Sequence, residues 1–337
     1  HRIIEGKYTL NISNDVIVTQ NAIENMIKCM DSDESIAWIV PSTSNMCNNQ
    51  SLEVNYTTID EMHEFANKNN KVDPYRWEQR QRLCNPIDLQ RSKIWYSSDG
   101  IGWGGHFHTT NQNIAPDEKV SLILRRRGYK MILAKDAYCH HFGGVTRKDE
   151  IVNYIDKNGN EGSEYFYKEA RLEFYKKYKI DPLGIGVEYD PVLFENINFE
   201  KNNELDILGI NCGIGATPLK IKEIIKEKAH NLNSTIFNIT DDENYIEDLG
   251  AISNYIGYFD DINNVEEMIK FNNFDYIIFE SKLEKYNDIL NIVNLLKSKL
   301  KEGGLLILYI IDLNLINTIT NYFTDTLVIN NNWVILK

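Results

Sequence analysis

The segment Asn211-Cys212-Gly213-Ile214-Gly215 places two glycines directly after the apolar run Asp206–Ile210. A glycine turn between a buried strand and a helix lets a ligand approach the main chain closely, because no side chain stands in the way. The residues that follow, from about Thr217 to Ala229, have a helical pattern. Strand, glycine turn and helix in this order are typical of the start of a nucleotide-binding α/β domain.

Further apolar runs predict the rest of this domain. We expect strands at Ser234–Asn238, Phe274–Phe279 and Gly304–Ile311, and a helix over Tyr286–Lys301 that ends in a left-handed cap at Gly303-Gly304. The last residues, Thr326–Ile329 and Trp333–Leu336 around three asparagines, predict an antiparallel hairpin. Together these elements predict a doubly wound α/β sheet over residues 201–337.

This half resembles class I S-adenosylmethionine-dependent methyltransferases. ILGINCGIGA is similar to their glycine motif, and FDYIIFESKLEKYND and LKSKLKEGGLLILYI are similar to their fourth-strand and fifth-strand regions. Gly209 stands where the family often has an acidic residue, and Asn211 where it usually has its first glycine. The resemblance implies S-adenosylmethionine as cofactor, held by Gly209, Cys212, Gly213 and Gly215, with Asp241 or its neighbour Asp242 on the ribose hydroxyls. The alternative is a Rossmann-like domain without catalysis.

The first half carries carboxylates and imidazoles at the ends of expected elements. Asp15 interrupts an apolar strand over Tyr8–Thr19, and Asp117 follows Pro116 at the start of an amphipathic stretch. The pair His140-His141 comes shortly after a strand expected at Met131–Ala134. Taken singly, these residues have ordinary interpretations: a turn-forming aspartate, a helix N-terminal acid and a histidine pair without a ligand.

In this order the first-half motifs resemble family 2 glycosyltransferases of the GT-A fold. The segments are NDVIVT, PSTSNMCNNQ, EVNYTTIDEMHEFA, DEKVSLILRRRGYK and AKDAYCHHFGGVT, and they span roughly residues 5 to 150. The resemblance implies that Asp15 and His141 hold Mn²⁺ or Mg²⁺ and that Asp117 is the catalytic base. His140 is the less suitable ligand, because adjacent strand residues point to opposite faces.

The implied chemistry accounts for these residue types. A sugar leaving a nucleotide diphosphate builds up negative charge, which a divalent cation neutralises. Oxygen ligands suit Mg²⁺ or Mn²⁺, and an added imidazole favours Mn²⁺. A carboxylate takes the proton of the attacking hydroxyl, and attack from the opposite side inverts the anomeric centre. The family's nucleotide-binding front part would precede His1, so the first domain is expected to be incomplete.

Composition limits the remaining possibilities. The chain has 337 residues, and 36 Lys+Arg against 49 Asp+Glu give a formal charge of −13, which disfavours nucleic acid as a partner. The five cysteines are widely spaced and lack a C-x-x-C pair, which indicates reduced thiols in a cytoplasmic protein. No apolar run reaches the length of about 20 residues that a membrane span needs.

We therefore expect a glycosyltransferase-like region at residues 1–150, a helical connector at 151–200, including a helix over Ser163–Tyr178, and a methyltransferase-like domain at 201–337. The leading hypothesis is a metal-dependent inverting glycosyltransferase that uses a nucleotide-sugar donor and a surface glycan or protein acceptor, flagellin among the acceptors considered. The alternatives are a non-catalytic scaffold of the same glycan pathway and a sugar methyltransferase with a degenerate glycosyltransferase domain.

Overall fold

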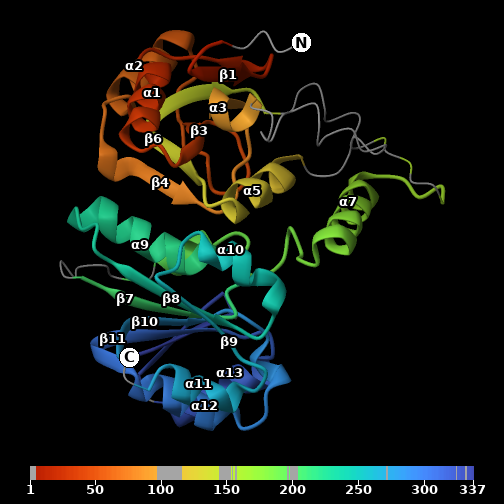
Figure 1. Cartoon of the computed structure of the whole chain (residues 1–337), viewed down its shortest axis with the longest axis vertical. Coiled ribbons are helices and arrows are strands. Elements are labelled where there is room, and N and C mark those ends of the chain that lie inside the picture. Colours follow the sequence, from red (N-terminus) through yellow and green to blue (C-terminus); the bar gives the residue numbers. More distant parts are fainter. Residues whose placement is uncertain are drawn as a thin grey trace. The chain divides into compact units, whose positions relative to one another are not determined.

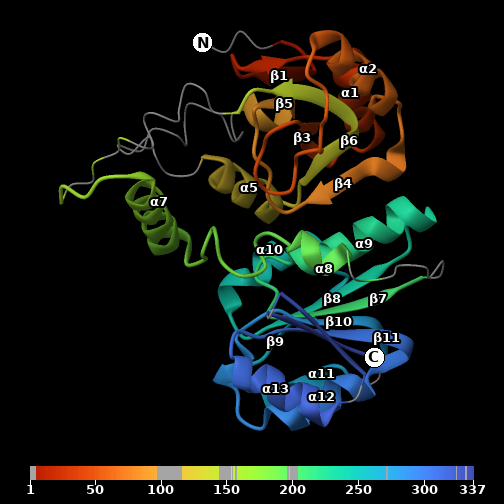
Figure 2. The same ribbon diagram turned by 180° about the vertical axis from the view of Figure 1, so that it is seen from behind.

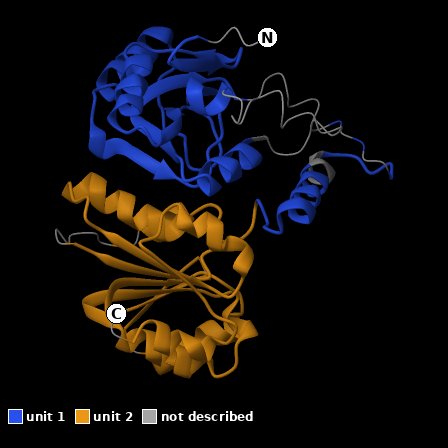
Figure 3. Ribbon diagram, in the orientation of Figure 1, with its two compact units in different colours: residues 1–182 blue, residues 183–337 orange. Residues whose placement is uncertain are grey.

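The computed structural model describes residues 5–96, 116–143, 153, 155, 158–195, 197, 204–270, 272–323, 325–330 and 332–337. The chain divides into two compact units, His1–Pro182 and Leu183–Lys337 (Figure 3). The helix at Ser163–Tyr178, which the sequence analysis assigned to a connector, belongs to unit 1.

Unit 1 is built on a mixed six-stranded sheet with the path β1-β5-β3-β6-β2. Strands β3 and β6 are parallel neighbours, whereas β5 pairs antiparallel with β3, and β2 and β4 pair antiparallel with β6. The strands are β1 (Tyr8–Ile12), β2 (Val16–Ile17), β3 (Ile36–Thr43), β4 (Trp77–Arg80), β5 (Ile87–Arg91) and β6 (Lys130–His141). The helices are α1 (Ala22–Ser32), α2 (Ile59–Asn69), the 3-10 turn η1 (Pro74–Arg76), α3 (Ser92–Tyr96), α5 (Pro116–Arg126) and α7 (Ser163–Tyr178).

Alternation along the strands of unit 1 produces two hydrophobic clusters. One contains Met26 and Met30 of α1 together with Ile39 of β3. The other contains Trp38 and Val40 of β3, together with residues of α3 and α5. Because neighbouring strand residues face opposite ways and every residue of β3 is buried, this strand is covered on both faces.

Unit 2 is a seven-stranded sheet in the order β12-β13-β11-β10-β7-β8-β9. Strands β9, β8, β7, β10 and β11 are parallel, β13 is antiparallel to β11, and β12 is antiparallel to β13. The strands are β7 (Asp206–Ile210), β8 (Thr235–Thr240), β9 (Tyr255–Tyr258), β10 (Phe274–Phe279), β11 (Leu300–Tyr309), β12 (Thr326–Ile329) and β13 (Trp333–Leu336). The order reverses at β7, as in doubly wound Rossmann-like sheets.

Helices cover both faces of this sheet (Figures 1 and 2). Helices α9 and α10 lie on one side and α11, α12 and α13 on the other (Figure 1), and α8 lies beside α9 (Figure 2). The helices are α8 (Pro191–Glu195), α9 (Ala216–Ala229), η2 (Glu243–Tyr245), α10 (Ile246–Gly250), η3 (Ile262–Asn264), α11 (Val265–Met268), η4 (Leu283–Lys285), α12 (Ile289–Ser298) and α13 (Leu313–Tyr322). The core therefore consists of two apolar layers, one on each face of the sheet.

Most elements predicted for unit 2 are confirmed, including both strands of the closing hairpin and the strand at Phe274–Phe279. The predicted cap at Gly303-Gly304 is wrong. Helix α12 already ends at Ser298, and Gly303, with a φ of 68°, lies inside strand β11. The Cβ that Gly304 lacks would lie 3.0 Å from the Asp275 carbonyl, so these glycines serve the contact with β10.

Candidate functional site

The carboxyl ends of three parallel strands of unit 2 bring polar residues to one edge of the sheet. The glycine turn follows β7, Asp241 follows β8 and Glu280 follows β10. Strand β7 has β8 on one side and β10 on the other, so this edge is the point where the strand order reverses. Open α/β sheets bind ligands outside such a point.

The glycine turn contains three residues with positive φ. Asn211 has a φ of 53°, Gly213 of 53° and Gly215 of 84°. Asparagine tolerates the left-handed region better than other residues with a side chain, because its short amide can form local hydrogen bonds. Asn211 can therefore stand where the resemblance expects a glycine, and its amide takes part in the site.

The backbone of unit 2 itself occupies part of the space over this turn. A Cβ on Gly213 would lie 2.3 Å from the carbonyl oxygen of Ile185, and a Cβ on Gly186 would lie 2.1 Å from that of Cys212. The Gly186 carbonyl also accepts a hydrogen bond of 3.2 Å from the Ala216 amide, at the first residue of α9. Gly213 is therefore required for packing within the protein, whatever ligand the turn binds.

Two other predicted binding residues lie inside the fold. Gly209 is within β7, where an added Cβ would lie 2.2 Å from the Asn238 Oδ1 atom. The Cys212 side chain is buried, and its thiol lies 3.6 Å from the carbonyl oxygens of Ile210 and Ile278. The structure brings their backbones to the glycine turn, whereas the Cys212 thiol faces inward.

Asp241 lies at the centre of a hydrogen-bonded group at this edge. Its backbone amide donates to Asn211 Oδ1 over 2.8 Å, and Asn211 Nδ2 donates to the Tyr286 hydroxyl over 2.7 Å. Lys285 Nζ and the Tyr286 hydroxyl both donate to Asp241 Oδ2, over 2.6 and 2.5 Å. We see no hydrogen bond to Asp241 Oδ1 within the described part of the chain, which leaves this oxygen as an acceptor.

The neighbouring carboxylate, Asp242, is used within the fold. Asp242 Oδ1 accepts from the Asn244 amide over 3.0 Å and so caps the short 3-10 helix η2. Of the two acids considered from the sequence, Asp241 is the one hydrogen-bonded to the glycine turn. A carboxylate oxygen in this position can accept hydrogen bonds from ligand hydroxyls.

Glu280 is a buried acid that the sequence analysis did not identify. It directly follows β10, and burial, with a further contribution from the charge of Asp190, raises its pKa to about 8. Its carboxyl lies beside Thr217 and Cys212, and its Oε2 atom lacks a hydrogen-bond partner among the described residues. The sequence does contain a signal for Glu280, because this acid directly follows an apolar strand of the same predicted sheet as the glycine turn.

In unit 1, the structure brings together two residues that the sequence analysis paired. His141 Nε2 lies 3.3 Å from Asp15 Oδ2, with 11% and 13% of the two side chains exposed. Their contact follows from the sheet, because Val16 of β2 pairs with His141 of β6. The amide of Phe142 also donates to the Asp15 carbonyl over 3.0 Å.

The other ring nitrogen of His141 determines what this contact requires. Nδ1 lies 2.5 Å from the Asn45 carbonyl oxygen, which can only accept, so Nδ1 carries a proton. A neutral ring then directs the Nε2 lone pair towards the Asp15 carboxylate. The contact between Nε2 and the Asp15 carboxylate is favourable if Nε2 is also protonated or if a cation lies between them. The imidazole nitrogen and the carboxylate oxygen are donor types that suit Mn²⁺.

The neighbouring imidazole lies in an aromatic environment. His140 Nδ1 lies 2.5 Å from the Tyr56 hydroxyl and 3.1 Å from Ser44 Oγ, and its ring packs against Phe142. Burial and the charge of His141 lower the pKa of His140. Within the described part of the chain, no group of three or more His, Cys, Asp or Glu side chains could hold a metal ion. Asp15 and His141 therefore meet as a pair and not as part of a larger group of such side chains.

Asp117 occupies the first turn of α5, next to a buried ion pair. Arg82 donates to the carboxylate of Glu118 through Nε over 3.0 Å, and both side chains are nearly buried. Burial, together with the charge of Glu118, raises the pKa of Asp117 well above its usual value, while Arg82 lowers it. A carboxyl with a raised pKa is a better proton acceptor once ionised, as a catalytic base requires.

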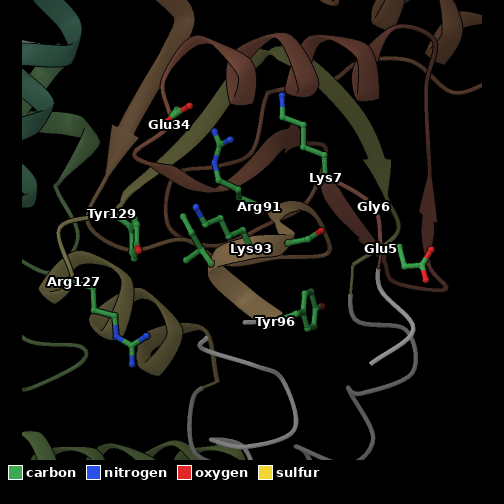
Figure 4. Close-up of a pocket in the computed structure, with 11 residues that line it drawn as sticks. Glu5, Gly6, Lys7, Glu34, Arg91, Lys93, Tyr96, Arg127 and Tyr129 are labelled. Carbon is green, nitrogen blue, oxygen red and sulfur yellow. The ribbon is translucent and has the colours of Figure 1, made fainter. Parts of the chain in front are cut away.

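A pocket of about 920 Å³ opens at the other end of the same sheet (Figure 4). Its lining includes Lys7, Arg91, Lys93 and Arg127, together with the acids Glu5 and Glu34. The Arg91 guanidinium donates to the carbonyls of Ile36 and Asp33 and so holds the fold together. The pocket lining does not include Asp15, Asp117 or His141.

No family model matches the sequence, and no curated protein matches it. Solved structures that align with the chain include a ribosomal protein L11 methylase from Lactobacillus delbrueckii subsp. bulgaricus, with 17% identity over 40% of this chain and 69% of that chain and a TM-score of 0.26. The plantazolicin methyltransferase BpumL in complex with SAH aligns with 14% identity over 50% of this chain and 57% of its own, at a TM-score of 0.28. Coclaurine N-methyltransferase bound to N-methylheliamine and SAH aligns with 14% identity over 47% of this chain and 39% of its own, at a TM-score of 0.25.

At these identities and TM-scores the similarities carry no weight for fold or function. The Rossmann-like character of unit 2 follows from its own strand order. Within the described residues, no helix is long and apolar enough to cross a membrane.

Proposed function

We propose that the protein is an S-adenosylmethionine-dependent methyltransferase whose cofactor binds at the carboxyl edge of β7 and β8. The observation that carries the proposal is the hydrogen bond from the Asp241 amide to Asn211, which joins the glycine turn to the acid after the next strand. The strand order of unit 2, with parallel strands and a closing antiparallel hairpin, supports a Rossmann-like nucleotide-binding fold.

The residues at this edge fit the cofactor. Asp241 Oδ1 can accept a hydrogen bond from a ribose hydroxyl, while Lys285 and Tyr286 hold Oδ2 and fix the carboxylate. Asn211 fixes both the Asp241 backbone and the Tyr286 hydroxyl. S-adenosylmethionine, when bound, supplies an electrophilic methyl group on its sulfonium sulfur. The chain's part is to hold the ribose hydroxyls through the Asp241 carboxylate.

Binding of S-adenosylmethionine and S-adenosylhomocysteine to the full chain, measured by calorimetry, tests this proposal. We expect Asp241→Asn to weaken binding by about 10- to 100-fold, the effect of losing a hydrogen bond to a charged acceptor. Asp242→Asn is the matched control, because that side chain caps η2 and should leave the affinity unchanged. Wild-type protein that binds neither compound would refute the proposal and favour a non-catalytic role.

A second candidate function rests on a different observation, the 3.3 Å approach of His141 Nε2 to Asp15 Oδ2. We propose that these atoms hold Mn²⁺ in a glycosyl transfer site, with Asp117 as the base. The divalent ion, when bound, would neutralise the charge of a leaving diphosphate. Asp15 and His141 would fix its position, and Asp117 would receive the acceptor's proton.

Hydrolysis of a panel of nucleotide sugars by the full chain, with and without Mn²⁺, tests the second candidate. We expect slow Mn²⁺-dependent turnover that falls at least about 100-fold in Asp117→Asn, the scale of lost general base catalysis. His141→Gln should abolish the Mn²⁺ dependence, whereas His63→Gln, an exposed histidine of α2, should leave it intact. Turnover that is absent, or unchanged in Asp117→Asn, removes this candidate.

A further inference from the structure

Two cysteines of unit 1 lie next to each other, although they are far apart in the sequence. The Sγ atoms of Cys47 and Cys84 are 3.2 Å apart. Cys47 is exposed and Cys84 is buried, and neither is in a disulfide. The contact joins the loop after β3 to the loop between β4 and β5.

Side-chain hydrogen bonds hold these two loops together independently of the sulfurs. Gln50 uses both ends of its amide on one residue: Oε1 accepts from the Cys84 amide over 2.8 Å, and Nε2 donates to the Cys84 carbonyl over 2.7 Å. Asn48 Nδ2 donates to the Arg82 carbonyl over 2.7 Å. All these polar side chains are buried. The fold therefore places the two thiols in contact before any bond joins them.

The loop that carries Cys47 also contacts one group of the second candidate site. The Cys47 loop contains Asn45, whose carbonyl contacts His141 Nδ1. Charge on Cys47 would raise the pKa of Asp117, whose pKa is raised chiefly by burial. A covalent change at the pair would therefore alter the surroundings of both groups.

We propose that Cys47 and Cys84 form an oxidative modification site, in which a peroxide converts the two thiols into a disulfide. The Cys47 sulfur attacks a peroxide oxygen, the O–O bond breaks, and Cys47 becomes a sulfenic acid with release of water. The Cys84 sulfur then attacks the Cys47 sulfur, an S–S bond forms, and the sulfenic oxygen leaves as a second water. The two thiols lose two electrons, which reduce one hydrogen peroxide to two waters.

The difference in exposure assigns the order of the two steps. Cys47 is exposed to solvent. Cys84 is buried, and its hydrogen bond with Cys47 together with this burial raises its pKa, which keeps Cys84 a thiol. Exposed sulfurs are oxidised first, and a neighbouring second cysteine resolves the sulfenic acid. The three remaining cysteines, Cys29, Cys139 and Cys212, are all buried.

Peptide mapping of the full chain after treatment with hydrogen peroxide tests the proposal. Trypsin cleaves after Lys28 and Lys68, which leaves Cys29 and Cys47 on one peptide, and after Arg82 and Arg91, which isolates Cys84. Cys29→Ala is therefore the reference protein, because only Cys47 then remains on the first peptide. We expect a cross-linked pair of these peptides under non-reducing conditions, loss of two titratable thiols, and full recovery of both with dithiothreitol.

A second variant separates a specific pair from general reactivity. In Cys84→Ser, Cys47 has no resolving thiol, so we expect it to proceed to sulfinic and sulfonic acids that dithiothreitol does not reverse. Cys139→Ala should still form the cross-link. The proposal is refuted if Cys47 of the reference protein over-oxidises while Cys84 stays a thiol, or if the cross-link forms between two chains. Neither outcome depends on S-adenosylmethionine binding or sugar transfer, so the test stands apart from the proposed functions.

Discussion

The two units build their polar sites in different ways. In unit 2 the glycine turn, Asp241 and Glu280 come from the ends of three parallel strands, so the fold brings them to one edge as a matter of topology. In unit 1 Asp15 and His141 meet because β2 pairs antiparallel with β6, a contact between distant parts of the chain. A site of the first kind depends on local motifs, whereas a site of the second kind depends on one strand register.

The units also differ in how far their polar groups satisfy one another. Lys285 and Tyr286 both donate to one carboxylate oxygen of Asp241, Oδ2, while no hydrogen bond to its Oδ1 is seen among the described residues. The Asp15–His141 contact needs either a second proton on the imidazole or a cation. Hydrogen bonds between side chains therefore hold the Asp241 group of unit 2 in place, whereas the pairing of β2 with β6 brings Asp15 and His141 of unit 1 together.

The largest effect is expected from adding a methyl group to the glycine turn. Gly213→Ala should destabilise unit 2 by about 3–5 kcal/mol, because it combines a left-handed backbone with overlap on the Ile185 carbonyl. Gly128 of unit 1 also has a positive φ but no atom within 4 Å of an added Cβ, so Gly128→Ala should cost only about 1–2 kcal/mol. Scanning calorimetry of the full chain measures both. Equal costs would show that the turn is not packed by its own backbone.

An intermediate effect is expected from Glu280, and it should depend on pH. Because burial raises the pKa of Glu280 to about 8, the folded protein holds this proton more tightly than the unfolded chain does. Its contribution to stability is therefore present at low pH and is lost as the pH rises from about 4.5 towards 8. Glu280→Gln, which mimics the neutral acid, should be of similar stability at pH 5 and more stable than wild type at pH 8.5, by on the order of 3 kcal/mol.

Thermal unfolding of both proteins between pH 5 and 8.5 measures this difference. Glu284→Gln is the control, because the Glu284 carboxylate accepts from the amides of Ile311 and Asp312 on the exposed side. If the difference in stability between wild type and Glu280→Gln does not change between pH 5 and pH 8.5, Glu280 does not hold its proton in the way proposed.

The smallest effect is expected from one hydroxyl of the Asp241 group. Tyr286→Phe removes a donor to Asp241 and an acceptor for Asn211 and should cost about 1 kcal/mol of stability. S-adenosylmethionine affinity should fall only a few-fold, since Lys285 still holds the carboxylate. Tyr322→Phe, an exposed tyrosine of α13, is the control. A complete loss of binding in Tyr286→Phe would mean that Tyr286 contacts the ligand directly.

Local patterns predicted much of unit 2 from the sequence. Strands β7 and β10 and the closing hairpin were predicted at their observed bounds, because each is a short apolar run between turn residues. Helix α12 was predicted too long, since its apolar pattern continues into β11. The glycines that looked like its cap are needed where β11 crosses close to β10.

Tertiary contacts explain what the sequence could not predict in unit 1. The prediction ended a strand at Ala134, yet β6 continues to His141. The register slips between Pro41 and Ser42, so that Lys135 and Asp136 lie opposite no residue of β3. Asp136 is buried there and accepts from the Trp77 indole, a partner that no local pattern reveals. The Cys47–Cys84 contact was missed for the same reason.

The place of β13 in the sheet has a consequence for synthesis. Strand Trp333–Leu336 is buried and lies between β11 and β12, so an inner position of the sheet is filled by residues from the end of unit 2. During translation, the backbone hydrogen-bonding groups on one edge of β11 have no partner strand until β13 has been synthesised. The described sheet of unit 1 needs nothing beyond His141 and can close far earlier. During synthesis, the sheet of unit 2 therefore keeps an unpaired strand for longer than the described sheet of unit 1 does.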